Sequence, residues 1–272
     1  MMPDLAADLA LAMTAASEAG ALAFSMLGSA SWDKSPGNPV SDADIAVDRL
    51  LQARLLQARP GYGWLSEETA DNPDRLASRA LWVVDPIDGT RDFLRGRNGW
   101  AVSVALVVDG QVQVGVLDAP ALGTRFAASR GQGSTRNGQS IHVSGRQSSA
   151  GARLPVDPQL ITSKLWTQPL DAVAVYKPNG IALRIAMVAC AEADAIFDGR
   201  SSSEWDVAAA ALILAEAGGT ITDRDGLPYS FNKPAPTTAG LVAATPALHA
   251  PMLARLAEAR AALNRAGIRV DR

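Results

Sequence analysis

The sequence predicts a mixed α/β fold with two subdomains, residues 1–145 and 146–272. Three observations support this prediction. In the first half, two apolar, strand-like runs flank Asp109-Gly110, and Asp-Gly between such runs is a strong β-hairpin signal. In the second half, longer helical patterns alternate with short strands. Between them, residues 144–160 are rich in Ser, Gly and Pro, as expected of a domain junction.

The first element is expected to be an amphipathic, Ala-rich helix at residues 5–27. This segment contains Asp8 and Glu18, and no basic residue precedes it. A signal peptide needs a positive start and an uncharged apolar core, and a membrane span tolerates few charges. The segment therefore predicts a helix of a cytoplasmic protein that has no membrane partner.

A loop and a second helix are expected next. Residues 31–40 contain Pro, Gly and Asn and are predicted to form a turn-rich loop. Residues 41–58 carry apolar side chains at helical spacing. Ser41 followed by Asp44 is close to a capping box, which predicts the start of this helix.

The rest of the chain predicts strands first and then helices alternating with strands. Cys190 is expected to be a small core residue within one of these helices. Gly218-Gly219 is expected to end another helix. Strands are expected within 62–69, 80–85, 99–120, 123–138, 220–223 and 240–245, and helices within 180–197, 204–217 and 246–264. The strand at 80–85 is expected to end at Asp85 and to be followed by a turn.

Composition excludes several classes of protein. The chain has 272 residues, of which 48% are hydrophobic and 19% charged, and its net charge is −3. There is no basic field to attract a nucleic acid polymer or an anionic membrane. A single cysteine cannot form an intramolecular disulfide, which suits a reducing, cytoplasmic compartment. The two histidines, His142 and His249, lie far from other candidate ligands, so no zinc site is expected.

Five acidic residues lie where strands are expected to end or helices to begin. Clusters of oxygen ligands suit hard cations such as Mg²⁺. If the acids met without cations, their repulsion would raise some of their pKa values and reduce stability. Two or more Mg²⁺ ions would resolve this repulsion, and such a site is the usual apparatus for displacement at phosphorus. The five acids are Asp44, Glu67, Asp85, Asp88 and Asp206.

A purely structural role is open for each acid taken alone. Asp44 and Asp206 each follow a serine by three residues, so each could be a first-turn acid favoured by the helix dipole. Asp88 before Gly89 could belong to an Asx turn. Spacing in the sequence leaves open whether these acids meet in space.

The joint pattern resembles the inositol monophosphatase family. These are lithium-sensitive, Mg²⁺-dependent phosphatases that include 3′(2′),5′-bisphosphate nucleotidases and histidinol-phosphate phosphatases. The resemblance rests on "WVVDPIDGT" with an upstream "EE" and on "SEWDVAAAALILAEAGG", and it extends from about Lys34 to about Leu248. Ser41 and Ser66 stand where the family usually has threonine and glycine. The resemblance implies a layered αβαβα sandwich of the sugar phosphatase type, with the active site between the subdomains, and a homodimer.

The resemblance also implies a set of metal ligands. Glu67, Asp85 and the Ile87 carbonyl would hold a first Mg²⁺. Asp85, Asp88 and Asp206 would hold a second, so that Asp85 bridges the two ions. A third, weaker ion would lie near Glu67. Lithium would compete at the second site.

Catalytic and substrate contacts are implied as well. Thr90 and Asp44 would form the pair that orients and deprotonates the attacking water, with Glu67 assisting. The amides of Gly89 and Thr90 would receive the phosphate, which also follows from the affinity of a helix N-terminus for anions. Lys34 would lie near the metals. Arg91 and Asp206 would contact the substrate.

The substrate is predicted to be 3′-phosphoadenosine 5′-phosphate, with inositol 1-phosphate next and histidinol phosphate third. Arg91 after "DGT" resembles the bisphosphate nucleotidases and also the histidinol-phosphate phosphatases, and "SEWD" in the second signature resembles the nucleotidases. A guanidinium suits a second phosphate, because it offers two donors. Equally, Arg91 could pair with Asp92 or with a nearby backbone group. Asn179-Gly180 replaces the family's Gly-Ser, which leaves the substrate contacts there open.

Two readings from other classes remain. A haloacid-dehalogenase-type phosphatase has the motif Asp-x-Asp-Gly-Thr with a nucleophilic aspartate, but in "DPIDGT" the acids are three residues apart. A non-catalytic regulatory protein on the same fold would be expected to have lost metal ligands, whereas here every ligand position is filled.

Overall fold

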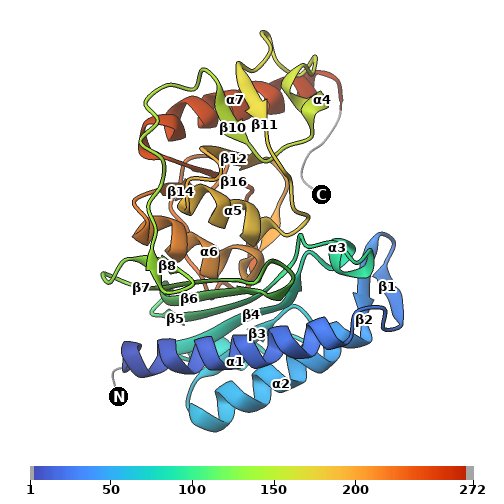
Figure 1. Ribbon diagram of the computed structural model, residues 1–272, viewed down its shortest axis with the longest axis vertical. Helices are drawn as coiled ribbons and strands as arrows, with labels where there is room; N and C mark the ends of the chain where they lie inside the picture. Colours follow the sequence, from blue (N-terminus) through green and yellow to red (C-terminus); the bar gives the residue numbers. More distant parts are fainter. Residues whose placement is uncertain (1–2, 268–272) are drawn as a thin grey trace.

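A seven-stranded sheet forms the base of the computed structural model, which describes residues 3–267 (Figure 1). Its strand order is β3-β4-β5-β6-β7-β8-β9. Neighbouring strands are antiparallel except β3 and β4, which are parallel. The strands are β3 (Gly63–Ser66), β4 (Ala80–Asp88), β5 (Ala101–Val108), β6 (Gln111–Ala119), β7 (Thr124–Ser129), β8 (Ser134–Arg136) and β9 (Gln139–Ser140).

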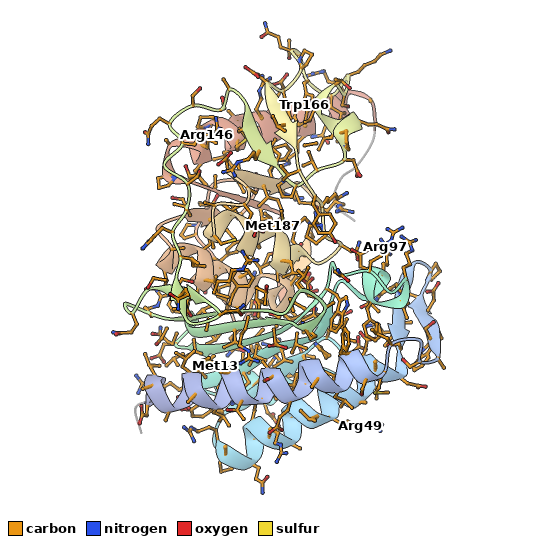
Figure 2. The ribbon with its side chains drawn as sticks, in the orientation of Figure 1. Met13, Arg49, Arg97, Arg146, Trp166 and Met187 are labelled. Carbon is orange, nitrogen blue, oxygen red and sulfur yellow. The ribbon has the colours of Figure 1, made fainter. Side chains whose placement is uncertain are left out.

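Helices cover both faces of this sheet. On one face lie α1 (Leu5–Ser25) and α2 (Asp42–Ala58), and on the other lie α5 (Ile181–Ala189) and α6 (Glu204–Glu216) (Figure 1). Met13 on α1 and Met187 on α5 are on opposite sides of the sheet in Figure 2. The approach of α6 is close, because a Cβ at Gly115 of β6 would come within 2.6 Å of the Ala209 carbonyl oxygen.

A second, smaller β layer lies beyond α5 and α6. It has the strand order β12-β16-β14, and α7 (Pro246–Arg265) covers its outer face (Figure 1). The sequence of layers is therefore helix, sheet, helix, sheet, helix, and the predicted layered sandwich is confirmed. In the second half of the chain the other elements and their bounds are β10 (Ala152–Leu154), β11 (Ala172–Ala174), β12 (Ala195–Asp198), β13 (Ser202–Ser203), β14 (Thr220–Thr222), β15 (Thr237–Thr238), β16 (Leu241–Ala244) and α4 (Pro158–Ile161). Two short 3₁₀ helices, Pro73–Ala77 and Pro120–Leu122, lie in the first half.

The largest core cluster joins residues from both halves of the chain. Leu65 and Val83 of the large sheet belong to the same buried cluster as Ile185 of α5 and Val207 of α6. Because this core is shared across residue 145, the division into subdomains 1–145 and 146–272 stays a prediction.

The α1 helix is long and apolar enough to span a membrane, by length and composition alone. It nevertheless lies along the large sheet, with Ala12, Ala16 and Ala19 completely buried. These small side chains allow the helix to approach the strands closely. In this fold α1 is a core helix.

Three local predictions were wrong or incomplete. Residues 31–40 form a hairpin, β1 (Ser31–Ser35) and β2 (Asn38–Ser41), whose first strand is exposed throughout and so has no apolar alternation to reveal it. The helix expected over 180–197 ends at Ala189, because Ala191 has a positive φ of 59°, and the chain then enters β12. The strand expected to end at Asp85 continues to Asp88.

Candidate active site

The acidic end of β4 contains a bulge. Asp85 pairs with Ser103 and Asp88 with Ala101, so one extra residue lies on β4 between these two pairs. Bulges bend a strand and redirect its side chains. Asp85 Oδ1 accepts a hydrogen bond of 3.0 Å from the Ile87 amide, which closes the bend. Both aspartates are buried.

Three carboxylates converge at this bend. Glu67 follows β3, Asp85 belongs to β4, and Asp206 lies in the first turn of α6. One carboxylate oxygen from each residue lies within 4.8 Å of the other two. Side chains up to 139 positions apart therefore meet where the large sheet faces α6.

The electrostatics of this cluster fit a divalent cation. Burial raises the pKa of Asp85 and of Asp206 well above the usual range of an aspartate, and the neighbouring carboxylates raise it further. A cation bound by all three would remove that repulsion, and an all-oxygen donor set suits Mg²⁺. The residues present thus fit Mg²⁺, the metal that the resemblance implies.

The Thr90–Asp44 pair is present in the structure. Thr90 Oγ1 lies 3.3 Å from Asp44 Oδ1 and 3.1 Å from the Ile87 carbonyl oxygen, so its proton can be donated to either. Asp44 Oδ2 accepts from the Ser41 amide at 2.8 Å and from the Ser41 hydroxyl at 2.6 Å. Asp44 therefore completes the capping box of α2 and contacts Thr90 at the same time.

The Asp206 carboxylate also combines two roles. Its Oδ2 accepts a hydrogen bond of 2.8 Å from the Ser203 amide at the start of α6. Asp44 and Asp206 thus each cap a helix and lie beside the proposed site, and the catalytic and ligand roles of the two acids stay predictions. The cap fixes where each acid lies.

Asp88 lies outside the three-carboxylate cluster. Its two carboxylate oxygens accept hydrogen bonds from the first amides of α5, Ile181 at 3.0 Å and Ala182 at 2.8 Å. Burial raises the pKa of Asp88 to about 6 although these amides lower it. A Cβ at Gly180 would come within 2.5 Å of Asp88, so this segment requires glycine there. Its role as a ligand of a second ion stays a prediction.

The turn that would receive the phosphate lies next to the acids. Gly89 has a φ of 99°, a conformation that glycine adopts without strain, and it begins the short helix α3 (Thr90–Leu94). A Cβ at Gly89 would lie 2.6 Å from the Gly99 carbonyl oxygen. A cavity of about 170 Å³ is lined by Gly89, Thr90 and the acids of the cluster.

Lys34 reaches the cluster from the β1–β2 hairpin. Its Nζ lies 2.9 Å from Glu67 and 2.7 Å from Glu68. The Glu68 carboxyl is almost fully buried, and this burial raises its pKa to about 7. Lys34 thus lies beside one predicted metal ligand, as the sequence indicated.

The two features that suggested a nucleotide substrate have structural partners. Arg91 is exposed, and its Nη2 donates to the Gly37 carbonyl oxygen at 2.5 Å, which is the backbone alternative considered for it. Glu204 of "SEWD" is fully buried and accepts from the amides of Asn232 and Lys233 at 2.7 and 3.1 Å. Its side chain therefore holds a loop and is not available to a substrate.

Sequence reasoning missed two arginines beside the site. A cavity of about 620 Å³ adjoins Asp88, Gly89 and Asp206 and is also lined by Arg184 and Arg200. Arg184 is only 9% exposed and donates to the carbonyl oxygens of Asn179 and Gly180. A single arginine in the otherwise apolar helix "IALRIAMVA" was the signal that could have identified it.

The raised pKa values predict a pH-dependent response to Mg²⁺. Among the predicted ligands, the pKa of Asp88 is raised from 3.8 to about 6, and the pKa values of Asp85 and Asp206 are raised well above 3.8. Their protonated forms favour folding at low pH, and for Asp88 this contribution is lost as the pH rises from about 4 through about 6. Mg²⁺ binds the ionised carboxyls, so the rise in Tm caused by Mg²⁺ should be larger at pH 8 than at pH 5.

Thermal unfolding at both pH values, in EDTA and in Mg²⁺, measures this response. An equal rise in Tm at pH 5 and pH 8 would show that these carboxyls do not bind the ion.

Comparison with known proteins supports the resemblance to the inositol monophosphatase family. The sequence model of the inositol monophosphatase family matches residues 4–262. An inositol-1-monophosphatase from Mesorhizobium japonicum is 35% identical over 203 residues, covering 71% of this chain and 75% of that protein. A histidinol-phosphatase from Mycobacterium tuberculosis is 34% identical over 263 residues, covering 92% of this chain and 97% of that protein. The extragenic suppressor protein SuhB from Bartonella henselae has a similar structure, with a TM-score of 0.78, 28% identity, and coverage of 92% of this chain and 98% of that chain.

Proposed function

The chain belongs to the inositol monophosphatase family, and from this membership and the geometry of its acids we propose that it hydrolyses phosphate monoesters with the help of Mg²⁺. The observation that carries the proposal is the convergence of Glu67, Asp85 and Asp206 within 4.8 Å. Members of the family hydrolyse phosphate monoesters and depend on Mg²⁺.

The proposed ligands are those expected from the sequence. Glu67, Asp85 and the Ile87 carbonyl would hold one ion, and Asp85, Asp88 and Asp206 a second. A third would lie near Glu67. When bound, the ions supply positive charge to the phosphoryl oxygens and lower the pKa of water. The number of ions, and lithium competition at the second site, are part of the proposal.

The protein's own groups act on the water and the phosphate. Thr90 Oγ1 accepts a hydrogen bond from the attacking water, and the Asp44 carboxylate 3.3 Å away receives the proton that Thr90 passes on. The amides of Gly89 and Thr90, at the start of α3, hold phosphoryl oxygens. No covalent phosphoenzyme is expected, which separates this mechanism from that of a haloacid-dehalogenase-type phosphatase.

We propose 3′-phosphoadenosine 5′-phosphate as the substrate. The cavity beside the acids contains Arg91, Arg184 and Arg200, and guanidinium groups are suited to a second phosphate. Arg200 is paired with Asp198 at 2.7 Å, whereas no carboxylate within residues 3–267 lies within 4 Å of Arg184. Arg184 therefore places a positive charge at the wall of this cavity that no neighbouring carboxylate among the described residues neutralises.

Inositol 1-phosphate and histidinol phosphate are the alternative substrates. Each is suggested by the name of a relative, and the histidinol-phosphatase covers more of this chain. Asp198 lines the same cavity and could meet the ammonium group of histidinol phosphate if it exchanged Arg200 for the substrate.

Arg184→Met should raise the KM for the bisphosphate selectively. A charge-assisted hydrogen bond contributes about 1.5–3 kcal/mol, so kcat/KM for 3′-phosphoadenosine 5′-phosphate should fall by about 10- to 150-fold. Inositol 1-phosphate, which has one phosphate, should be affected much less. Arg91→Ala should act in the same direction, with a smaller effect because Arg91 is exposed. The measurement is kcat/KM for the three esters on one preparation of each variant.

Arg97→Ala is the matched control for the loss of positive charge. Arg97 follows α3 on the side of the β1–β2 hairpin (Figure 2), and it lines neither cavity beside the acids. Its kcat/KM values should match those of the wild type. An equal loss for all three esters in Arg184→Met would indicate collapse of the Asn179–Gly180 segment. A tenfold preference of the wild type for inositol 1-phosphate would reject the nucleotide assignment.

A homodimer and a cytoplasmic location complete the proposal. The first is implied by family resemblance, and the second is supported by the single cysteine. Light scattering of the purified protein tests the dimer. A regulatory, non-catalytic role is the remaining alternative, and it would be supported if Mg²⁺ binds but no ester is hydrolysed.

A further inference from the structure

A second acid of α2, Asp48, lies beside the site without a role in the proposed chemistry. It follows Asp44 by four residues, so the two acids share one face of the helix. Asp44 contacts Thr90 on one side of the site. Asp48, only 6% exposed, contacts the turn that contains Glu67 on the other side.

Each oxygen of the Asp48 carboxylate accepts one hydroxyl proton. Ser66 Oγ donates to Oδ1 at 2.5 Å, and Thr69 Oγ1 donates to Oδ2 at 2.6 Å. The two hydroxyls also accept hydrogen bonds, from Trp64 Nε1 to Thr69 at 3.2 Å and from the Glu68 amide to Ser66 at 3.5 Å. The residues immediately before and after Glu67-Glu68 are thus held by one carboxylate.

The other contacts of Glu67 do little to fix the position of its side chain, so that position depends on the Ser66–Thr69 turn. The Glu67 amide donates to the Val84 carbonyl oxygen at 3.3 Å, which anchors only its backbone. Its carboxylate is contacted by Lys34, whose side chain is 27% exposed and comes from a strand that is exposed throughout. The buried Asp48 carboxylate, with its two short hydrogen bonds, therefore holds the Glu67 turn more firmly than the partly exposed Lys34 does.

We propose that Asp48 is a positioning residue, which fixes the Ser66–Thr69 turn and thereby holds Glu67 in the three-carboxylate cluster. The inference rests on the proposed function, since it assigns Asp48 to the metal site of that function. Partners of metal ligands commonly change metal affinity by about 10- to 100-fold when they are removed. Ser66, where the family usually has glycine, then supplies one of the two hydroxyls that Asp48 holds.

Removing either hydroxyl should weaken Mg²⁺ binding. Thr69→Val keeps the shape of the side chain, and Ser66→Ala removes one oxygen. Each should raise the half-saturating Mg²⁺ concentration for phosphate release by about 10-fold, with kcat at saturating Mg²⁺ close to that of the wild type. Calorimetric titration of the protein with Mg²⁺ alone should show a matching loss of affinity. Thr69→Ser restores the hydroxyl and should bind as the wild type does.

Ser144→Ala is the matched control for a purely structural role. It removes a hydrogen bond of the same kind, 2.6 Å long, from Ser144 Oγ to the buried Asp194. Arg146, which also donates to Asp194, lies far from Arg97 and α3 in Figure 2. This variant should lower Tm about as much as Ser66→Ala and leave the Mg²⁺ affinity unchanged.

The outcomes separate this inference from the proposed function. If Ser66→Ala and Thr69→Val lose stability but bind Mg²⁺ as tightly as the wild type, Asp48 has only a structural role and the inference is overturned. If either variant fails to fold, Asp48→Asn, which retains one acceptor oxygen, must show a weakened affinity for Mg²⁺ or the inference is likewise rejected. Failure of the wild type itself to bind Mg²⁺ and release phosphate would refute the proposed function instead.

Discussion

The Asp85→Asn variant should lose about 10³-fold or more in kcat, equivalent to about 4 kcal/mol of activation free energy. Asp85 belongs to the three-carboxylate cluster and is proposed to bridge two ions, so its loss should weaken both. Asparagine has nearly the same shape and can keep the hydrogen bond from the Ile87 amide, which is 3.0 Å long. Steady-state phosphate release in saturating Mg²⁺ measures the loss.

Thermal stability distinguishes this loss from unfolding. Burial and neighbouring acids disfavour the charged form of Asp85 in the metal-free protein. A neutral asparagine should therefore give a Tm in EDTA that is no lower than that of the wild type. Asp109→Asn, the same chemical change at an exposed hairpin turn of the same sheet, should leave turnover unchanged. Asp85→Asn with more than a tenth of wild-type kcat would remove Asp85 from the mechanism.

The Thr90→Ala variant should lower kcat by about 10²-fold or more, since a positioned proton-transfer group contributes about 10²- to 10⁴-fold. Its hydroxyl lies 3.3 Å from Asp44, and Thr90 is not one of the three residues of the carboxylate cluster. The affinity for Mg²⁺ should therefore remain close to that of the wild type. Single-turnover kinetics, together with calorimetric titration with Mg²⁺, separates the chemical step from metal binding.

Thr90→Ser is the matched control, because it retains the hydroxyl and loses only a methyl group. It should recover most of the wild-type kcat. Normal turnover in Thr90→Ala would exclude the Thr90–Asp44 pair from water activation. A large loss of Mg²⁺ affinity in Thr90→Ala would assign Thr90 to the metal site instead.

Local signals in the sequence were enough to locate the acids on their elements. The capping box predicted the start of α2 at Ser41, and Asp44 lies in its first turn. Asp109-Gly110 predicted the hairpin, and both residues adopt the positive φ values, 50° and 75°, that such a turn requires. Apolar runs predicted the strands of the large sheet because both faces of that sheet are covered by helices.

Other features depend on contacts that sequence spacing does not contain. The β1 strand is exposed throughout, so no apolar alternation marks the hairpin that it forms with β2. The α5 helix ends before Ala191, which has a positive φ, and the buried Asp194 that follows pairs with Arg146 and Arg153 from another part of the chain. The directions of Arg91 and Glu204 were likewise decided by distant backbone groups.

The acid cluster shows both what the sequence predicted and what depended on contacts between distant residues. Family resemblance indicated that Asp85 and Asp206 meet, whereas spacing alone left this open. The structure brings them together with Glu67 but turns Asp88 toward the amides of α5. Arg184 was overlooked because its surroundings in the sequence are those of a buried core helix.

Phosphate release before and after removal of divalent metal tests the central claim most directly. The purified protein is incubated with 3′-phosphoadenosine 5′-phosphate, inositol 1-phosphate and histidinol phosphate in EDTA, and again after Mg²⁺ is restored in excess. The Glu67, Asp85 and Asp206 cluster predicts no release in EDTA and release of phosphate from at least one ester once Mg²⁺ returns. Equal release in EDTA and in Mg²⁺, or no release from any ester by protein that binds Mg²⁺, would contradict it.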